Sequence, residues 1–361
     1  MTMKKLLLAT VALLCSLMGK ADNGFAIGDF TIAANGEVTV QIVMNNDEVF
    51  SGFQFDLELP EGVSIKKNAQ NKYIMAATNR LKVYDEFEDT YVPTHTVECN
   101  QQPSGLYRVM VYSGSSANIS GTSGTAVLRT QFVASDRVAT GNFTPKFKNI
   151  VMSTAAEVQY KPADCTYNCT VTLSTNVTTI GYASFSWPKA LDFTNSGLTA
   201  YIATSCSNNS LHLESVTKVP ANTGLILKGT AGSDKTYPLE TTSDESLDDV
   251  SENMLTSNTT GVYEVTTNNV YVLSNLNDGK PGFYIANNGI HVGQYKSFLV
   301  LSENLARKGL VFVEGSETPT GVENYVQDVT KNTVYRDLQG RLVKNPGKGV
   351  YVVDGKKRII K

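Results

Sequence analysis

The sequence predicts an all-β protein, and three observations support this fold class. Apolar and polar residues alternate along Val38–Met44 and again along Phe53–Leu59, and a period of two residues is typical of half-buried antiparallel strands. Turn signals such as Asn35–Gly36 recur between short apolar runs. The composition is rich in aromatic residues, Gly, Thr and Asn, and no long charged amphipathic run is present. Because each predicted sheet has one apolar face that needs covering, we expect a sandwich.

The length and charge of the chain limit the classes of protein it can be. At 361 residues it can hold two domains and a tail. A net charge of −3 and an isoelectric point near 5.7 provide no basic surface for nucleic acid. After the N-terminal leader, no stretch is long and apolar enough to span a bilayer. We therefore expect neither a nucleic-acid partner nor a membrane-spanning segment.

The N-terminus has the pattern of a signal peptide over residues 1–21. Lys4 and Lys5 provide the charged region, Leu6–Met18 the apolar region, and Gly19 and Ala21 the small residues before a cleavage site. Cys15 does not favour a lipoprotein, because Leu14 stands where a lipidation motif has a small residue. We expect an exported chain that begins near Asp22.

A first domain is predicted over residues 22–162. Strand patterns follow at Phe30–Ile32, Leu106–Tyr112 and Ala126–Val133, whereas Asn68–Val97 has the pattern of an irregular polar segment. Phe143–Met152 predicts a further strand, and Pro145 inside it favours an edge position.

This first domain resembles a cohesin-like domain over residues 27–160. The resemblance rests on the strand Val38–Met44, the segment Gly52–Leu57, the run from Ile119 through Gly124 into Leu128–Val133, and Phe147–Met152. Cohesins share a jelly-roll β-sandwich with a family of carbohydrate-binding modules. The resemblance implies a binding module that captures a dockerin or contacts a glycan. No dockerin-type calcium repeat is found elsewhere in the chain.

A second β-rich domain is predicted over residues 170–315. Its order of segments, GYASF, LTAYIA, VPANTGLILKG, GFYIA and SFLVL, resembles an uncharacterised module of secreted proteins from Gram-negative anaerobes. Between the domains, Cys165 and Cys169 are close enough for a disulfide, and buried free thiols are the alternative. A metal site with His95, Cys99, Cys206 and His212 is disfavoured, because these residues are scattered rather than paired.

Residues 316–332 are predicted to be a linker, and residues 333–361 a β tail of three short strands, with Asp354–Gly355 as a hairpin turn. The tail resembles a type IX secretion sorting domain. The matching residues are Pro346, Gly349, Tyr351, Val352, Val353, Lys357 and Lys361. The resemblance implies recognition by that secretion machinery and display on the surface of a Gram-negative bacterium. The alternative is that these strands dock on the second domain.

The candidate ligand-binding residues are Tyr84, Phe87 and Tyr91, because rings set among carboxylates are expected to be exposed and can stack on sugars or anchor a protein. Tyr107 shares a strand face with Val109 and Val111, so it is expected in the core. The neighbouring carboxylates have the chemistry to bind calcium but lack the spacing of a calcium loop, which favours a solvated acidic loop. These carboxylates are Asp85, Glu86, Glu88 and Asp89.

No catalytic residue or other cofactor is predicted. His95, His212 and His291 are isolated in the sequence, and no serine lies in a nucleophile motif. We expect a non-catalytic exported surface protein that binds a polysaccharide or a cell-surface protein through its N-terminal sandwich. Two alternatives are a structural surface or matrix component and an accessory polysaccharide-degrading enzyme.

Overall fold

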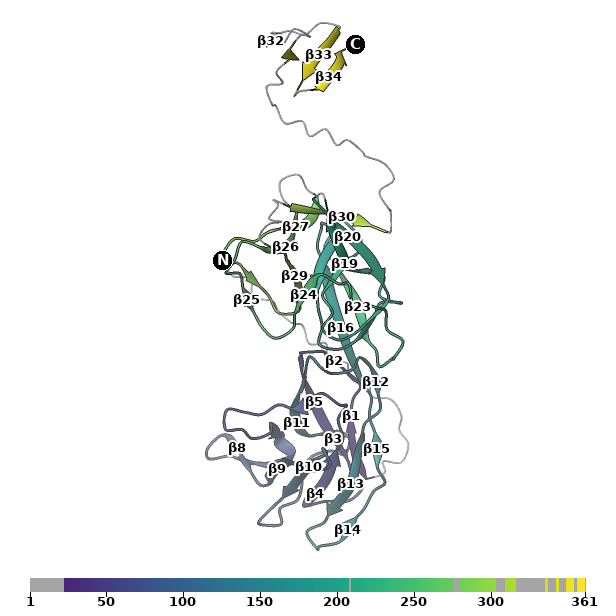
Figure 1. The fold of residues 1–361 in the computed structure, drawn as a ribbon. Helices are drawn as coiled ribbons and strands as arrows, with labels where there is room; N and C mark the ends of the chain where they lie inside the picture. The colour runs from purple at the N-terminus through teal and green to yellow at the C-terminus, as the bar shows by residue number, and fades with distance from the viewer. Residues whose placement is uncertain are drawn as a thin grey trace. The chain divides into compact units, whose positions relative to one another are not determined.

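The computed structural model describes residues 23–207, 209–275, 280–302 and 309–315, and the backbone of four strands between residues 335 and 360. Within these residues every regular element is a strand except one 3₁₀-helix, η1 (Asn79–Leu81). The all-β prediction is therefore confirmed (Figure 1). The predicted signal peptide and linker lie outside the described residues. The chain divides into two units after Gly315, and each is described by itself.

The N-terminal sandwich has two antiparallel sheets. In the first sheet, of order β1-β3-β11-β5, β6 also pairs with β11; its strands are β1 (Gly24–Ile27), β3 (Glu37–Asn45), β5 (Val63–Ile65), β6 (Met75–Ala77) and β11 (Thr125–Ala134). In the second sheet, of order β14-β13-β4-β10-β9, β15 also pairs with β13; its strands are β4 (Gly52–Leu57), β9 (Thr96–Gln101), β10 (Tyr107–Tyr112), β13 (Lys146–Ser153), β14 (Gln159–Tyr160) and β15 (Cys165–Thr166).

The apolar faces of the two sheets meet in one core. On β3, Val40, Ile42 and Met44 are buried as the alternation predicts. The ring of Phe25 lies 4.8 Å from those of both Phe53 and Phe55, measured between centroids. These rings bring β1 of one sheet against β4 of the other, so aromatic packing holds the sandwich together.

The segment 68–97, predicted to be irregular, contains regular structure. It holds β6, η1, β7 (Lys82–Asp85), β8 (Thr90–Pro93) and the first residues of β9. In the described structure β7 and β8 pair only with each other. Both faces of this hairpin are open to solvent, so its sequence lacks the apolar alternation by which a half-buried strand is recognised.

The predicted strand Phe143–Met152 is divided at Pro145. β13 begins at Lys146, whereas Phe143 is the last residue of β12 (Gly141–Phe143), which joins a different sheet. Proline lacks the N–H that a continuous ladder requires. The chain therefore changes sheets at this residue.

Two further sheets form the second β-rich region. One has order β12-β16-β23-β18-β21, with β2 paired to β16; its remaining strands are β2 (Phe30–Ala33), β16 (Cys169–Val177), β18 (Leu191–Asp192), β21 (Lys218–Val219) and β23 (Lys235–Thr241). The other has order β17-β22-β19-β20-β30-β27-β26-β29-β24; its strands are β17 (Tyr182–Phe185), β19 (Thr199–Ser207), β20 (Ser210–Val216), β22 (Leu225–Lys228), β24 (Leu255–Asn258), β26 (Val270–Asn275), β27 (Pro281–Ile285), β29 (Lys296–Val300) and β30 (Gly309–Glu314). A separate pair consists of β25 (Tyr263–Glu264) and β28 (His291–Val292).

Strand β16 joins the two regions. It pairs in parallel with β2 and antiparallel with β12, both from the first 162 residues, and antiparallel with β23 from the second region. The first strand of the predicted second domain is thus built partly on backbone from the first. No local pattern could have indicated this pairing, because it links residues that are more than 130 positions apart.

The predicted disulfide between Cys165 and Cys169 is not formed, since both thiols are free. Cys165 lies in β15 opposite Phe147 and donates to the main-chain oxygen of Phe25 at 3.0 Å. Cys169 begins β16 and is buried. The alternative of a buried free thiol describes Cys169, whereas Cys165 is a half-buried free thiol, and burial raises the pKa of Cys169 to about 11.

The C-terminal unit holds a sheet of four strands rather than three, of order β32-β31-β33-β34. They are β31 (Tyr335–Arg336), β32 (Leu342–Val343), β33 (Gly349–Val353) and β34 (Lys356–Ile360). Val353 pairs with Lys356, as a hairpin at the predicted place requires. Of the sorting-motif residues, Gly349, Tyr351, Val352 and Val353 lie in β33 and Lys357 in β34, whereas Pro346 and Lys361 lie outside the described residues.

Candidate binding surface

The β7–β8 hairpin, Lys82–Pro93, presents the three aromatic residues singled out in the sequence. Tyr84 pairs directly with Tyr91, and their rings form an edge-to-face pair with centroids 5.2 Å apart. Tyr84 and Tyr91 are each 46% exposed, and Phe87 at the tip is fully exposed. Their predicted exposure is confirmed. Tyr107, by contrast, is buried beside Val109, as its place in β10 predicted.

Hydrogen bonds within the hairpin shape its tip. Asp85 Oδ1 accepts from the main-chain N–H groups of Phe87 at 2.9 Å and of Glu88 at 3.3 Å. The Tyr84 hydroxyl donates to the carboxylate of Asp89, and this bond raises the pKa of Tyr84. The tip is therefore acidic, and two of its carboxylates accept hydrogen bonds from within the hairpin.

The four carboxylates of this loop are Asp85, Glu86, Glu88 and Asp89, for which the sequence favours a solvated acidic loop over a calcium site. In the described part of the chain, no group of three or more His, Cys, Asp or Glu side chains is placed to hold a metal ion. Two of the four carboxylates are already used by hydrogen bonds within the loop. Calcium needs six to eight oxygen ligands, so binding would require the loop to rearrange.

The register of the hairpin divides its side chains between two faces. Directly opposed residues share a face, as do residues two apart along one strand. Lys82, Tyr84, Tyr91 and Pro93 therefore lie together, on what we term the tyrosine face. Val83 and Val92 occupy the other face and are also exposed.

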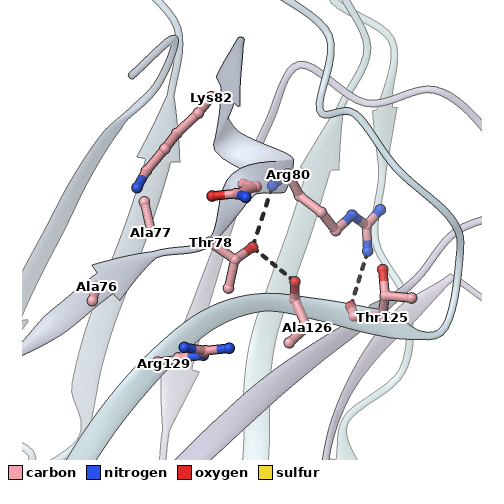
Figure 2. A pocket seen from close by; sticks show the side chains of 9 residues that line it. Ala76, Ala77, Thr78, Arg80, Lys82, Thr125, Ala126 and Arg129 are labelled. Carbon is pink, nitrogen blue, oxygen red and sulfur yellow. Dashed lines mark hydrogen bonds between the residues drawn. The ribbon is translucent and has the colours of Figure 1, made fainter. Parts of the chain in front are cut away.

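A pocket of about 500 Å³ opens where the hairpin meets the first sheet. Three cationic side chains, Arg80, Lys82 and Arg129, line it together with Asn79 and several small residues, and none of its lining residues is acidic. We term it the cationic pocket. Figure 2 shows Lys82 and Arg129 on the side of Ala77 and the guanidinium of Arg80 on the side of Thr125.

A β-bulge in β11 shapes the wall of this pocket. The register of β11 against β3 shifts between Ala126 and Leu128, which leaves backbone groups in need of other partners. Thr78 provides them: its N–H donates to the main-chain oxygen of Val127 at 3.1 Å, and its hydroxyl to that of Ala126 at 2.8 Å (Figure 2). Thr78 also caps η1, the helix that carries Arg80.

Arg80 contributes a buried positive charge to the pocket. Only 6% of the residue is exposed, and its guanidinium donates to the main-chain oxygens of Met44, Ser120 and Thr125 at 2.8–3.1 Å. Its fourth acceptor is the neutral side-chain oxygen of Asn46 at 2.9 Å. An arginine side chain stays protonated in proteins. All four acceptors are uncharged, so they satisfy its hydrogen bonds without neutralising its charge.

The cationic pocket was not predicted from the sequence. Its cations come from η1, the start of β7 and the middle of β11, and β6 carries Ala76 opposite Arg129. A local motif could not have indicated this grouping, because it depends on strand pairing between distant residues. The three histidines stay apart, with His95 buried before β9, His212 in β20 and His291 in β28.

No protein-family model matches this chain, and no curated protein matches it. Among solved structures it is similar to cohesin modules. The seventh ScaB type I cohesin from Pseudobacteroides cellulosolvens is 17% identical with a TM-score of 0.31, over 41% of this chain and 90% of the cohesin. The cohesin module of a family 33 glycoside hydrolase from Clostridium perfringens is 6% identical with a TM-score of 0.32, over 42% and 96%. The type II cohesin dyad of the ScaA scaffoldin from Acetivibrio cellulolyticus is 10% identical with a TM-score of 0.27, over 61% and 82%. Similarity at this level does not identify a ligand for this chain.

Proposed function

We propose that this chain is an exported, non-catalytic surface protein whose N-terminal sandwich binds a polysaccharide through the tyrosine face. The observation that carries the proposal is the exposed edge-to-face pair of Tyr84 and Tyr91. Aromatic rings stack on the apolar faces of sugar rings, and tyrosine hydroxyls add polar contacts. Two adjacent rings held on paired strands provide a platform that is already ordered before binding.

A glycan fits this surface better than a protein does. A standard protein interface buries about 800 Å² on each partner around a closely packed apolar centre. The hairpin offers two four-residue strands with charged residues at its tip. A single polysaccharide chain can follow such a narrow ridge, which favours a glycan over a cell-surface protein.

Export and surface display belong to the same proposal. The pattern of residues 1–21 supports passage through the inner membrane, and the sorting-type tail supports transfer to the surface of a Gram-negative cell by its secretion machinery. In the described residues, no helix is long and apolar enough to cross a membrane.

The test is affinity electrophoresis of purified residues 22–361 through gels that contain single polysaccharides. Tyr84→Ala and Tyr91→Ala should each weaken retardation about fivefold to tenfold, because a stacked ring contributes about 1 kcal/mol or more. Tyr112→Ala is the matched control: Tyr112 is 47% exposed but lies on β10, where it donates to Glu98 at 2.9 Å.

Retardation that neither hairpin variant changes would refute the role of the tyrosine face. If no polysaccharide retards the protein, a pull-down from the cell surface would then separate a protein ligand from a purely structural component. An accessory hydrolase would need two opposed carboxylates, and the lining of the cationic pocket contains none.

A further inference from the structure

We propose that the cationic pocket binds an acidic group of the polysaccharide, and that the hairpin selects a chain whose acidic groups are spaced apart. This inference rests on the proposed glycan-binding function. It adds the chemical class of the glycan, a chain in which uronate or sulfate units alternate with neutral units.

The cationic pocket and the two tyrosines share one surface. Lys82 lines the pocket, and the register of the hairpin places it on the same face as Tyr84 and Tyr91. Lys82 and Tyr84 are two residues apart on one strand, so their Cα atoms are separated by about 7 Å. One polysaccharide chain could therefore contact both tyrosines and place a neighbouring unit at the pocket.

The cationic pocket carries positive charge that no acidic residue of its lining balances. Arg80 is buried and bonded only to neutral acceptors. Across the described ranges, no ion pair joins Lys82 or Arg129 to a carboxylate, although other lysines and arginines are paired. An anion at the pocket could take charge-assisted hydrogen bonds from Lys82 and Arg129. The Arg80 charge would add to their attraction because it lies in a poorly solvated wall.

The charge of the hairpin changes from positive at Lys82 to negative at the tip. From Lys82 to Asp85 the strand covers about 10 Å, which is comparable with the Debye length at physiological ionic strength. The tip then presents Asp85, Glu86, Glu88 and Asp89. A glycan with an acidic group on every unit would be attracted at the pocket and repelled at the tip. A chain with neutral units between its acidic groups avoids this repulsion.

The experiment compares three polymers: hyaluronan, which has a uronate on alternate sugars; polygalacturonate, which has one on every sugar; and neutral xylan. Residues 22–361 should bind hyaluronan most tightly, with affinity that falls as salt is raised. Lys82→Gln and Arg129→Gln should each weaken hyaluronan binding about tenfold, the loss of one charge-assisted bond, and leave xylan binding unchanged. Both side chains reach solvent, so neither substitution threatens the core. Lys161→Gln is the control, because Lys161 is an exposed lysine outside the pocket.

The outcomes separate this inference from the proposed function. Equal affinity for xylan and hyaluronan, still lost in Tyr84→Ala, would overturn the binding role of the cationic pocket and leave that of the tyrosine face in place. Polygalacturonate bound as tightly as hyaluronan would overturn the selection for spaced charges. Absence of binding to all three polymers would overturn this inference, and the proposed function would fall with it only if no other polysaccharide retards the protein in affinity electrophoresis.

Discussion

The bidentate ion pair between Asp56 and Arg108 should stabilise the N-terminal sandwich by an amount that can be measured. Arg108 donates from Nε and Nη2 to the two carboxylate oxygens of Asp56, each at 2.8 Å, and Asn149 Nδ2 donates to one of them at 2.8 Å. The Asp56 side chain is 3% exposed and that of Arg108 is 37% exposed. The pair joins β4 to β10, two central strands of the second sheet.

The perturbation is Arg108→Met, which leaves the Asp56 carboxylate buried with one remaining side-chain donor. Removing one partner of a buried pair costs about 3–5 kcal/mol. Arg108 is more than a third exposed, and water can replace part of what it provides, so we expect a loss of about 2 kcal/mol in the free energy of unfolding. Asp56→Asn should cost about 1 kcal/mol, because it leaves no buried charge unpaired and Arg108 can be hydrated.

The same pair makes stability depend on pH. Hydrogen bonding to Arg108 lowers the pKa of Asp56 below its ordinary value of 3.8. The unfolded chain therefore takes up this proton at a higher pH than the folded chain does. The stabilisation is complete above pH 3.8 and is lost as the pH falls through the lower folded pKa. The difference between the wild-type protein and Arg108→Met should shrink over that acid range.

Hydrogen exchange resolved by peptide is the appropriate assay, because the only tryptophan, Trp187, lies in the core of the second β-rich region. Amides of β4 and β10 should exchange about 30-fold faster in Arg108→Met. Lys148→Met is the matched control: Lys148 pairs with Glu58 at 2.9 Å, and both side chains are about one third exposed. If Arg108→Met changed protection no more than the control does, the assigned energy of the buried pair would be refuted.

Three further predictions concern other parts of the chain. Burial lowers the pKa of His95, so the unfolded chain takes up a proton there at a higher pH than the folded chain does, and stability should fall as the pH drops below about 6.5. In a series of thermal melts from pH 7.5 to 5, the melting temperature of His95→Gln should depend less on pH than that of the wild-type protein. Gly62→Ala should cost about 2 kcal/mol, because a Cβ would lie 2.9 Å from the Cα of Val138 at a φ of +85°. Gly105→Ala, at the same φ with no atom within 4 Å, should cost about half as much in the same denaturation assay. Deletion of Gly349–Lys361 should retain the protein in the periplasm, and cell fractionation that still finds it on the surface would remove the sorting role of the tail.

Local sequence patterns predicted several of the strands that have one buried face. β3, β10 and β11 occupy the stretches that alternation or apolar runs indicated, and Tyr107 is buried as its phase required. Patterns failed at β7 and β8, where both faces are exposed, and between Cys165 and Cys169, where proximity in the sequence suggested a bond but both thiols are free.

One part of the candidate site could be predicted from the sequence and the other could not. Tyr84 and Tyr91 could be predicted as exposed, because aromatic residues set among carboxylates are poor candidates for a core. The cationic pocket could not be predicted, because its residues become neighbours only when β6 pairs with β11 and a bulge opens the ladder at Ala126. Hydrogen bonds between distant strands determine which side chains meet.

The sequence by itself determined the all-β class, the buried face of strands such as β3 and β10, and the exposure of Tyr84 and Tyr91, because these follow from periodicity and polarity within a few residues. Only the tertiary structure decided that β16 is shared between two regions. It also decided that the buried Arg80 guanidinium donates only to uncharged acceptors, and that Lys82 lines the cationic pocket together with Arg129. These features depend on pairing between segments far apart in the chain, and the periodicity within one segment does not specify which distant strand becomes its partner.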